Sequence, residues 1–170
     1  KIIIGIVDNI FSDDTAINLG DLRTLIKFLV INNNYNFEFI LQTKRGYLKK
    51  EFEKYGLNNT YITSEKGDFS LFSNVDLIIS IGWQSIALMS ASVFKKPFYF
   101  YSRLGYPYAN HYFSFKKNKN IRMNNLCKLL WLSEKNFTEK FYKLLKNKKD
   151  FDFIKKNSSE FLKEIGFYEN

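Results

Sequence analysis

The sequence contains one cysteine, one histidine and two prolines among its 170 residues. Cys127 cannot form an internal disulfide bond, and neither it nor His111 can build a metal site of several cysteine or histidine ligands. No apolar run approaches the roughly 20 residues that a membrane-spanning helix needs, and no signal-peptide pattern opens the chain. We therefore expect a cytoplasmic domain that is held together by packing alone.

The length and composition indicate one folded domain. Hydrophobic residues make up 45% of the sequence and charged residues 25%, as in an average soluble protein, and 170 residues suffice for a single core. The chain begins at Lys1 without an initiator methionine. We therefore expect residues 1–170 to form a single domain that is a fragment of a longer protein.

Positive charge is concentrated in the last third of the chain. The net charge is +9, and residues 116–170 contribute +7 of it. Clustered cations attract nucleic acids and anionic membrane surfaces. Only four of the 26 basic residues are arginines, the residue that specific nucleic-acid readers favour. Nucleic acid is therefore disfavoured as a partner, whereas a weak contact with the inner face of an anionic membrane stays open.

Short runs of β-branched and aromatic residues predict five strands, at residues 1–7, 37–42, 60–63, 76–81 and 97–102. Most are continuously apolar, which is typical of strands buried on both faces of a parallel sheet. Helical periodicity lies between them, at residues 21–31, 48–55 and 85–94. This alternation predicts an α/β fold, a Rossmann-like open parallel sheet of about five strands with flanking helices.

The C-terminal third has a different pattern. Residues 137–145 and 151–165 combine apolar side chains at helical spacing with many lysines. They predict two C-terminal amphipathic helices whose lysines form solvated faces. The Lys- and Asn-rich residues 116–125 predict a loop.

Ligands of open parallel sheets bind at the carboxyl ends of the strands, so the turn after the fourth predicted strand is informative. Gly82 and Trp83 lead into a helix that begins at Gln84 and Ser85. A glycine permits a tight turn, and the amide groups that open a helix attract a phosphate. Trp83 is suited to stacking on a base or packing on a partner. The alternative is a capped helix that needs its glycine only for the turn.

Two other turns carry cations. Lys44 and Arg45 follow the second predicted strand, and Ser102 and Arg103 follow the fifth. Each pair could bind a phosphate, and Arg103 could also hold a carboxylate. A solvated surface turn is the alternative for Lys44 and Arg45.

Metal and nucleophilic chemistry have little support. Asp8, Asp13 and Asp14 share one loop and could hold a divalent cation, but they could equally cap a helix or accept turn hydrogen bonds. His111 is the sole histidine and is better explained as a packed or surface residue than as a catalyst. We therefore predict no metal site and identify no catalytic residue.

Residues 76–101, DLIISIGWQSIALMSASVFKKPFYFY, resemble part of the C-terminal half of GT-B glycosyltransferases. In that family an aspartate-led strand ends in Ser-x-Gly and is followed by a helix of small residues, Gly-Lys-Pro and another strand. The segment resembles in particular enzymes of bacterial capsule and surface-polysaccharide synthesis, including polyol-phosphate and glycerophosphate transferases. This chain departs from the pattern at two points, with Met89 or Ser90 near the usual glutamate, and with Lys95 and Lys96 before Pro97 in place of Gly-Lys.

The resemblance implies a donor-binding domain whose turn receives the diphosphate of a nucleotide-activated sugar or polyol. It assigns Gly82, Gln84 and Ser85 to the phosphate side, with no bound cofactor, and it implies an N-terminal acceptor domain outside these 170 residues. The function expected is donor binding in a glycosyltransferase of surface-polysaccharide synthesis. A non-catalytic Rossmann-like interaction module is the alternative, and a nucleic-acid-binding protein is a third.

Overall fold

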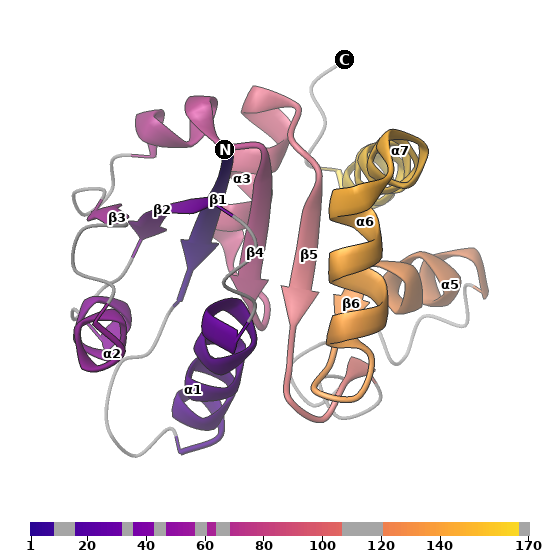
Figure 1. The fold of residues 1–170 in the computed structure, drawn as a ribbon. Coiled ribbons are helices and arrows are strands. Elements are labelled where there is room, and N and C mark those ends of the chain that lie inside the picture. The colour runs from indigo at the N-terminus through magenta and orange to yellow at the C-terminus, as the bar shows by residue number, and fades with distance from the viewer. Residues whose placement is uncertain are drawn as a thin grey trace.

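The computed structural model describes residues 1–8, 16–31, 36–42, 47–56, 61–63, 69–106 and 121–166. Its centre is a parallel sheet in the order β3-β2-β1-β4-β5-β6 (Figure 1). The strands are β1 (Ile2–Val7), β2 (Phe37–Gln42), β3 (Tyr61–Thr63), β4 (Leu77–Ile81), β5 (Phe98–Tyr101) and β6 (Trp131–Leu132). The predicted α/β class and parallel sheet are confirmed, and the two-residue β6 extends the five predicted strands at one edge.

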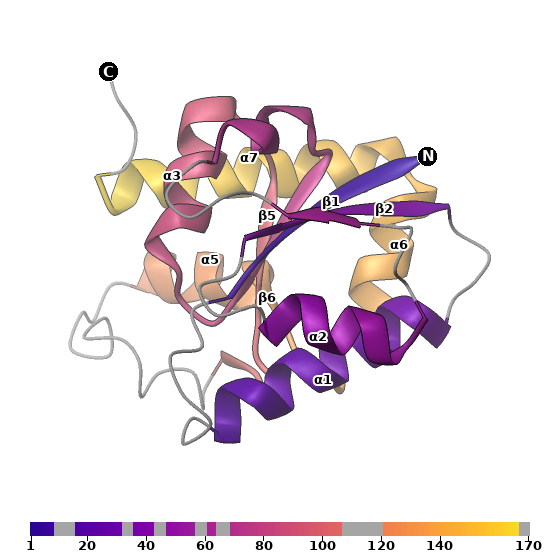
Figure 2. The same ribbon diagram turned by 90° about the vertical axis from the view of Figure 1, so that its left-hand side faces the viewer.

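Helices cover both faces of this sheet (Figure 2). One face carries α1 (Ala16–Ile31) and α2 (Tyr47–Lys54), and the other carries α3 (Ser85–Phe94), α7 (Lys148–Glu164) and the 3-10 helix η1 (Ser70–Asn74). Because both faces are covered, the strands can be apolar throughout, and all five residues of β4 are buried. Among the described residues, no helix is both long and apolar enough to cross a bilayer.

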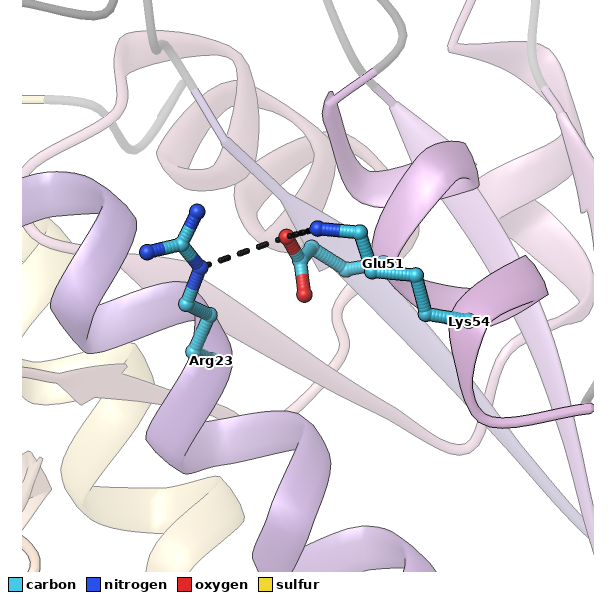
Figure 3. Close-up of polar contacts among 3 residues, drawn as sticks. All are labelled: Arg23, Glu51 and Lys54. Carbon is cyan, nitrogen blue, oxygen red and sulfur yellow. Dashed lines mark hydrogen bonds and ion pairs between the residues drawn. The ribbon is translucent and has the colours of Figure 1, made fainter.

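Polar groups join the central strands and the first two helices. Asp76, just before β4, donates its amide to the Ile3 carbonyl and accepts from the Ile3 amide through its side chain, both at 2.8 Å. These two hydrogen bonds explain why an aspartate precedes β4. Between α1 and α2, the buried Glu51 carboxylate accepts from Arg23 at 3.3 Å and from Lys54 at 2.9 Å (Figure 3). Both contacts satisfy a charge that would otherwise be costly to bury.

The C-terminal third differs from the sequence-based prediction. Within residues 116–125, predicted as a loop, residues 121–125 belong to α5 (Ile121–Leu130), and residues 116–120 lie outside the described part. The helix forms because Leu126, Cys127 and Leu130 are spaced to share one face and are buried in the core. The predicted helix at 137–145 is divided into a π-helical turn, Thr138–Tyr142, and α6 (Lys143–Lys146).

Helix α7 begins three residues earlier than predicted, at Lys148. The side chain of Asn147 accepts a hydrogen bond from the Lys149 amide at 2.9 Å. This is the N-cap geometry that satisfies one of the free amides at a helix start. The cap thus extends the helix by a first turn. The lysines of this turn show no hydrophobic periodicity, so the sequence pattern did not include it in the predicted helix.

Helix α3 ends at Phe94, and its C-cap residue Lys95 has a left-handed backbone with φ 53°. Its amide donates to the Ala91 carbonyl, so the residue closes the helix as glycine often does. This is the point at which the GT-B pattern has glycine. Lys95 therefore has a backbone conformation that glycine adopts without strain.

Replacing Lys95 by glycine should stabilise the protein by roughly 0.5–1 kcal/mol, because the strain of a left-handed side chain exceeds the added entropy of an unfolded glycine. Urea unfolding measures this difference. Lys96→Gly is the matched control, since Lys96 is not among the residues with positive φ, and it should not raise stability. Equal effects of the two substitutions would contradict this account of the turn.

Helix α1 is held against the end of β5 by Arg103 and Asp21. The Arg103 amide donates to Asp21 Oδ1 at 2.7 Å, and the guanidinium lies over Gly20, where an added Cβ would come within 2.7 Å of Nη1. Burial raises the pKa of the Asp21 carboxyl to about 6, against the opposing hydrogen bond and charge of Arg103. Asp21 therefore holds a proton more tightly in the folded protein than in the unfolded chain.

Because the folded pKa of Asp21 is raised from 3.8 to about 6, its contribution to stability is complete below pH 4 and is lost as the pH rises through 6. Asp21→Asn keeps an acceptor for the Arg103 amide and removes this titration. The free energy of unfolding of the variant, minus that of the wild type, should increase by about 1–3 kcal/mol between pH 4 and pH 7. Urea unfolding across this range checks it, and a constant difference would refute it.

Candidate functional site

The strand order places a crevice between β1 and β4. From β1 the chain crosses to β2 on one side, and from β4 it crosses to β5 on the other, so the two crossover connections diverge. In open α/β sheets the carboxyl ends of the strands at such a reversal form the ligand site. A pocket of about 210 Å³ lies there, and its lining residues are Val7, Asp8, Gln42, Trp83, Gln84, Ser85 and Ile86.

We call this space the switch-point pocket. Three of the predicted site residues line it, namely Trp83, Gln84 and Ser85. The sequence pattern indicates Asp8 only as one of three aspartates in a loop and does not indicate Gln42, although both stand at the carboxyl ends of strands. That position is the signal that could have identified them.

The start of α3 forms one wall. Gln84 is the N-cap residue, with extended backbone, but its side chain makes no capping hydrogen bond within the described residues. Its Nε2 instead donates to the Ile81 carbonyl at 2.8 Å. The amides of the first turn, which no helical carbonyl can accept, thus lie beside the pocket with the positive end of the helix dipole. This wall of the pocket therefore favours the binding of an anion.

Gly82 shapes the turn before α3. Its φ is +67°, and among the described atoms none lies within 4 Å of an added Cβ. The glycine is therefore required by the backbone conformation and not by crowding. Its amide donates to the Tyr101 carbonyl at 2.9 Å, and its carbonyl accepts from the Ser80 hydroxyl at 2.7 Å. These bonds hold the turn against β5.

Trp83 has an internal role that the sequence did not indicate. Its ring stacks on Phe100 of β5, with centroids 5.6 Å apart and planes 9° apart, and meets Phe161 of α7 edge-on at 6.0 Å. The side chain is half-buried and also lines the switch-point pocket. Packing on the core thus explains a tryptophan in this turn without a base or a partner domain.

The remaining predicted residues are elsewhere. Ser102 is buried, and its amide donates to the Leu132 carbonyl of β6 at 3.1 Å, while Arg103 lies over α1. Neither is among the described residues that line the switch-point pocket. Five further candidates lie outside the described residues: Lys44, Arg45, Asp13, Asp14 and His111. The described ranges contain no cluster of three His, Cys, Asp or Glu side chains that could hold a metal.

The opposite wall of the pocket has a different chemistry. Asp8 is buried directly after β1, and its amide donates to the Gln42 carbonyl at 3.1 Å. A carboxyl group accepts hydrogen bonds from hydroxyl groups. The switch-point pocket therefore has helix-start amides on one side and a buried carboxyl group on the other.

No family model matches the sequence, and no curated protein is similar to it. Two solved structures resemble the fold. A mutant of S. aureus TarM, in complex with fondaparinux, α-GlcNAc-glycerol and UDP, has a TM-score of 0.59 and 13% identity over 95% of this chain. WaaG, a glycosyltransferase involved in lipopolysaccharide biosynthesis, has a TM-score of 0.54 and 15% identity over 95% of this chain.

The chain spans only part of both proteins, 32% of the TarM chain and 42% of the WaaG chain. At these identities the comparison establishes the fold and not the activity. The chain therefore has a GT-B-like, Rossmann-type α/β fold.

Proposed function

We propose that this chain is the donor-binding domain of a glycosyltransferase that acts in surface-polysaccharide synthesis. Its ligand would be a nucleotide-activated sugar or polyol, bound as a substrate without a resident cofactor. The observation that carries the proposal is the start of α3, whose N-cap side chain leaves the first-turn amides to the switch-point pocket. The GT-B-like fold supports the same assignment.

The diphosphate binds at Ser85 and the amides that follow it. A helix start supplies several N–H donors and a positive partial charge at one point. In glycosyl transfer the bond between the sugar and the diphosphate breaks, and the negative charge grows on the departing nucleoside diphosphate. Donors already fixed at that place stabilise the developing charge without reorganising. Gly82 is required because its left-handed backbone turns the chain so that α3 begins beside the pocket.

The hydroxyl groups of the donor bind at Asp8. The resemblance places a glutamate for this purpose in the small-residue helix, near Met89 or Ser90. Here Ser90 is buried and donates its hydroxyl to the Ile86 carbonyl at 2.7 Å, and Met89 is exposed to solvent. Asp8, by contrast, is a buried carboxylate in the switch-point pocket. We assign the recognition of ribose or sugar hydroxyls to Asp8.

The acceptor site belongs to a further domain of the same protein. The chain covers less than half of each neighbour, and the switch-point pocket has one anion-binding and one hydroxyl-binding wall, so it accounts for a donor alone. We place the base that activates the acceptor outside this chain. Nucleotide-activated donors are cytoplasmic, so the reaction takes place in the cytoplasm or at the inner face of the membrane.

Nucleotide binding is tested with UDP, CDP and GDP by following tryptophan fluorescence, since Trp83 lines the pocket. At least one diphosphate should change the emission. Ser85→Glu places a carboxylate at the phosphate position, and it should weaken binding at least about tenfold through like-charge repulsion. The fold should survive, because an acidic residue is favourable in the first turn of a helix.

Val93→Glu is the matched control, because it adds the same charge to an exposed site two turns along the same helix. It should leave the affinity within about twofold, as expected for a screened exposed charge. If the wild type responds to no nucleoside diphosphate, or Ser85→Glu retains its affinity, the proposed phosphate site is wrong. Binding of a nucleotide without transfer, when the complete protein is assayed with acceptors, would favour the non-catalytic module.

A further inference from the structure

A second pocket lies where α5, α6 and α7 gather beside β5 and β6 (Figure 1). Its volume is about 230 Å³. We call it the α5–α7 pocket. It shares no lining residue with the switch-point pocket, so it is independent of the proposed nucleotide site. Its polar lining residues are Tyr99 of β5, Lys140 of the π-helical turn, Lys143 of α6 and Asp150 of α7.

The carboxylate of Asp150 is not explained by the start of its helix. Asp150 is the third residue of α7, from which an acidic side chain can reach back to the N-cap amide. Here the amide of the N-cap residue Asn147 donates to the Leu144 carbonyl instead. Asp150 Oδ2 is buried and has no hydrogen-bond partner among the described residues. A buried carboxylate oxygen is costly without a donor, and a ligand in the pocket can provide one.

Tyr99 brings a second polar group without a partner to the same place. Its side chain is only 2% exposed, and its hydroxyl forms no hydrogen bond within the described ranges. Tyr101, two residues along the same face of β5, does bond, to the Thr24 hydroxyl at 2.6 Å. Burial raises the pKa of the Tyr99 hydroxyl, and the charge of Asp150 raises it further, so the two groups are close. One ammonium group, with its three N–H donors, can bond to both.

The cations of the pocket stand apart from this carboxylate. Lys140 Nζ donates to the Lys128 carbonyl at 3.1 Å, which holds the ammonium in place and leaves it two more N–H donors. Burial lowers the pKa of Lys140, against the charge of Glu139. No ion pair found in the described part of the chain joins Lys140 or Lys143 to Asp150. The pocket can therefore hold an anionic group and an ammonium group at different points.

Exposed apolar side chains complete the lining. Leu129 of α5 and Phe153 of α7 are 36% and 52% exposed, and both line this pocket. Two such side chains beside lysines do not resemble the core of a protein interface, which buries about 800 Å² of each partner and is depleted of lysine. The volume is also below the range of about 300–1,000 Å³ that is usual for drug-sized ligands. These observations indicate a small molecule with an apolar part.

We propose that the α5–α7 pocket binds a free amino acid with an apolar side chain. The ammonium group binds at Asp150 and Tyr99, and the carboxylate binds at Lys140 and Lys143. The apolar side chain packs against Leu129 and Phe153. A phosphorylated ligand would pair with the lysines but would leave the Asp150 oxygen without a cation, and a simple amine would leave the lysines without an anion. An amino acid supplies both charges and an apolar group in one small molecule.

Isothermal titration calorimetry with L-leucine and L-phenylalanine tests this assignment. At least one of them should bind at millimolar concentration. Isoamylamine, which is leucine without its carboxylate, and 4-methylpentanoate, which is leucine without its amine, should bind at least about tenfold more weakly than leucine, because each lacks hydrogen bonds to a charged group. The corresponding analogues of phenylalanine are phenethylamine and 3-phenylpropionate. If neither amino acid binds, or if an analogue binds as tightly as its parent, the proposal is wrong.

Asp150→Asn should weaken amino-acid binding at least about tenfold, because it removes the charge that faces the ammonium. Asp152→Asn is the matched control, since Asp152 is exposed on the same helix and is not among the residues that line this pocket. It should leave the affinity within about twofold, and equal losses in the two variants would contradict the site. The fluorescence response to nucleoside diphosphates should be unchanged in both variants, so this test and the test of the nucleotide site fail separately.

Tyr99→Phe removes only the hydroxyl. It should weaken binding by about fivefold, and it should leave the free energy of unfolding unchanged or higher, because the hydroxyl has no protein partner to lose. A less stable variant with full affinity would show that the hydroxyl has a structural role alone.

A second copy of the chain is the competing occupant. Sedimentation equilibrium should show no self-association through this surface. A dimer of the wild type that Phe153→Ser dissociates would identify a protein interface and would overturn the proposal.

Discussion

The parallel pairing of β1 with β4 sets the position of the candidate site. Residues 4–7 pair with residues 77–80 in parallel, although about 70 residues separate them in the chain. Because β1 connects to β2 on one side and β4 to β5 on the other, this pairing fixes where the crossover connections diverge. It brings Asp8, at the end of β1, to the same pocket as the start of α3.

A layer of stacked aromatic rings connects the candidate site to the C-terminal third of the chain. Phe100 lies between Trp83 and Trp131, with ring centroids at 5.6 and 4.4 Å. Phe161 of α7 meets Phe100 edge-on at 5.5 Å. The rings join the turn before α3 to β5, β6 and α7, and such contacts are worth about 0.5–1.5 kcal/mol each beyond their buried area. The shape of the switch-point pocket thus depends on a helix that begins more than 60 residues later.

The two ends of α3 have opposite chemical environments. At its start, amide donors adjoin a buried carboxylate, and at its end a left-handed lysine adjoins three more lysines from two segments. The small residues of the helix make this possible. Ala87 and Ala91 are fully or almost fully buried, so α3 packs closely on the sheet and both of its ends lie at pocket walls.

Local sequence patterns predicted the α/β class, the five longer strands and the start of α3, because continuous apolar runs and a Gly-led turn can be recognised without distant contacts. They could not predict β6, whose two residues, Trp131 and Leu132, carry no periodicity. They also suggested Ser102 and Arg103 as ligand contacts, whereas the Ser102 amide bonds to β6 and the Arg103 amide bonds to Asp21 of α1. Local patterns could not show that Gln42 and Asp8 share one pocket or that Lys95 and Lys155 line another, because these neighbours come from separate segments whose approach depends on strand order and helix packing.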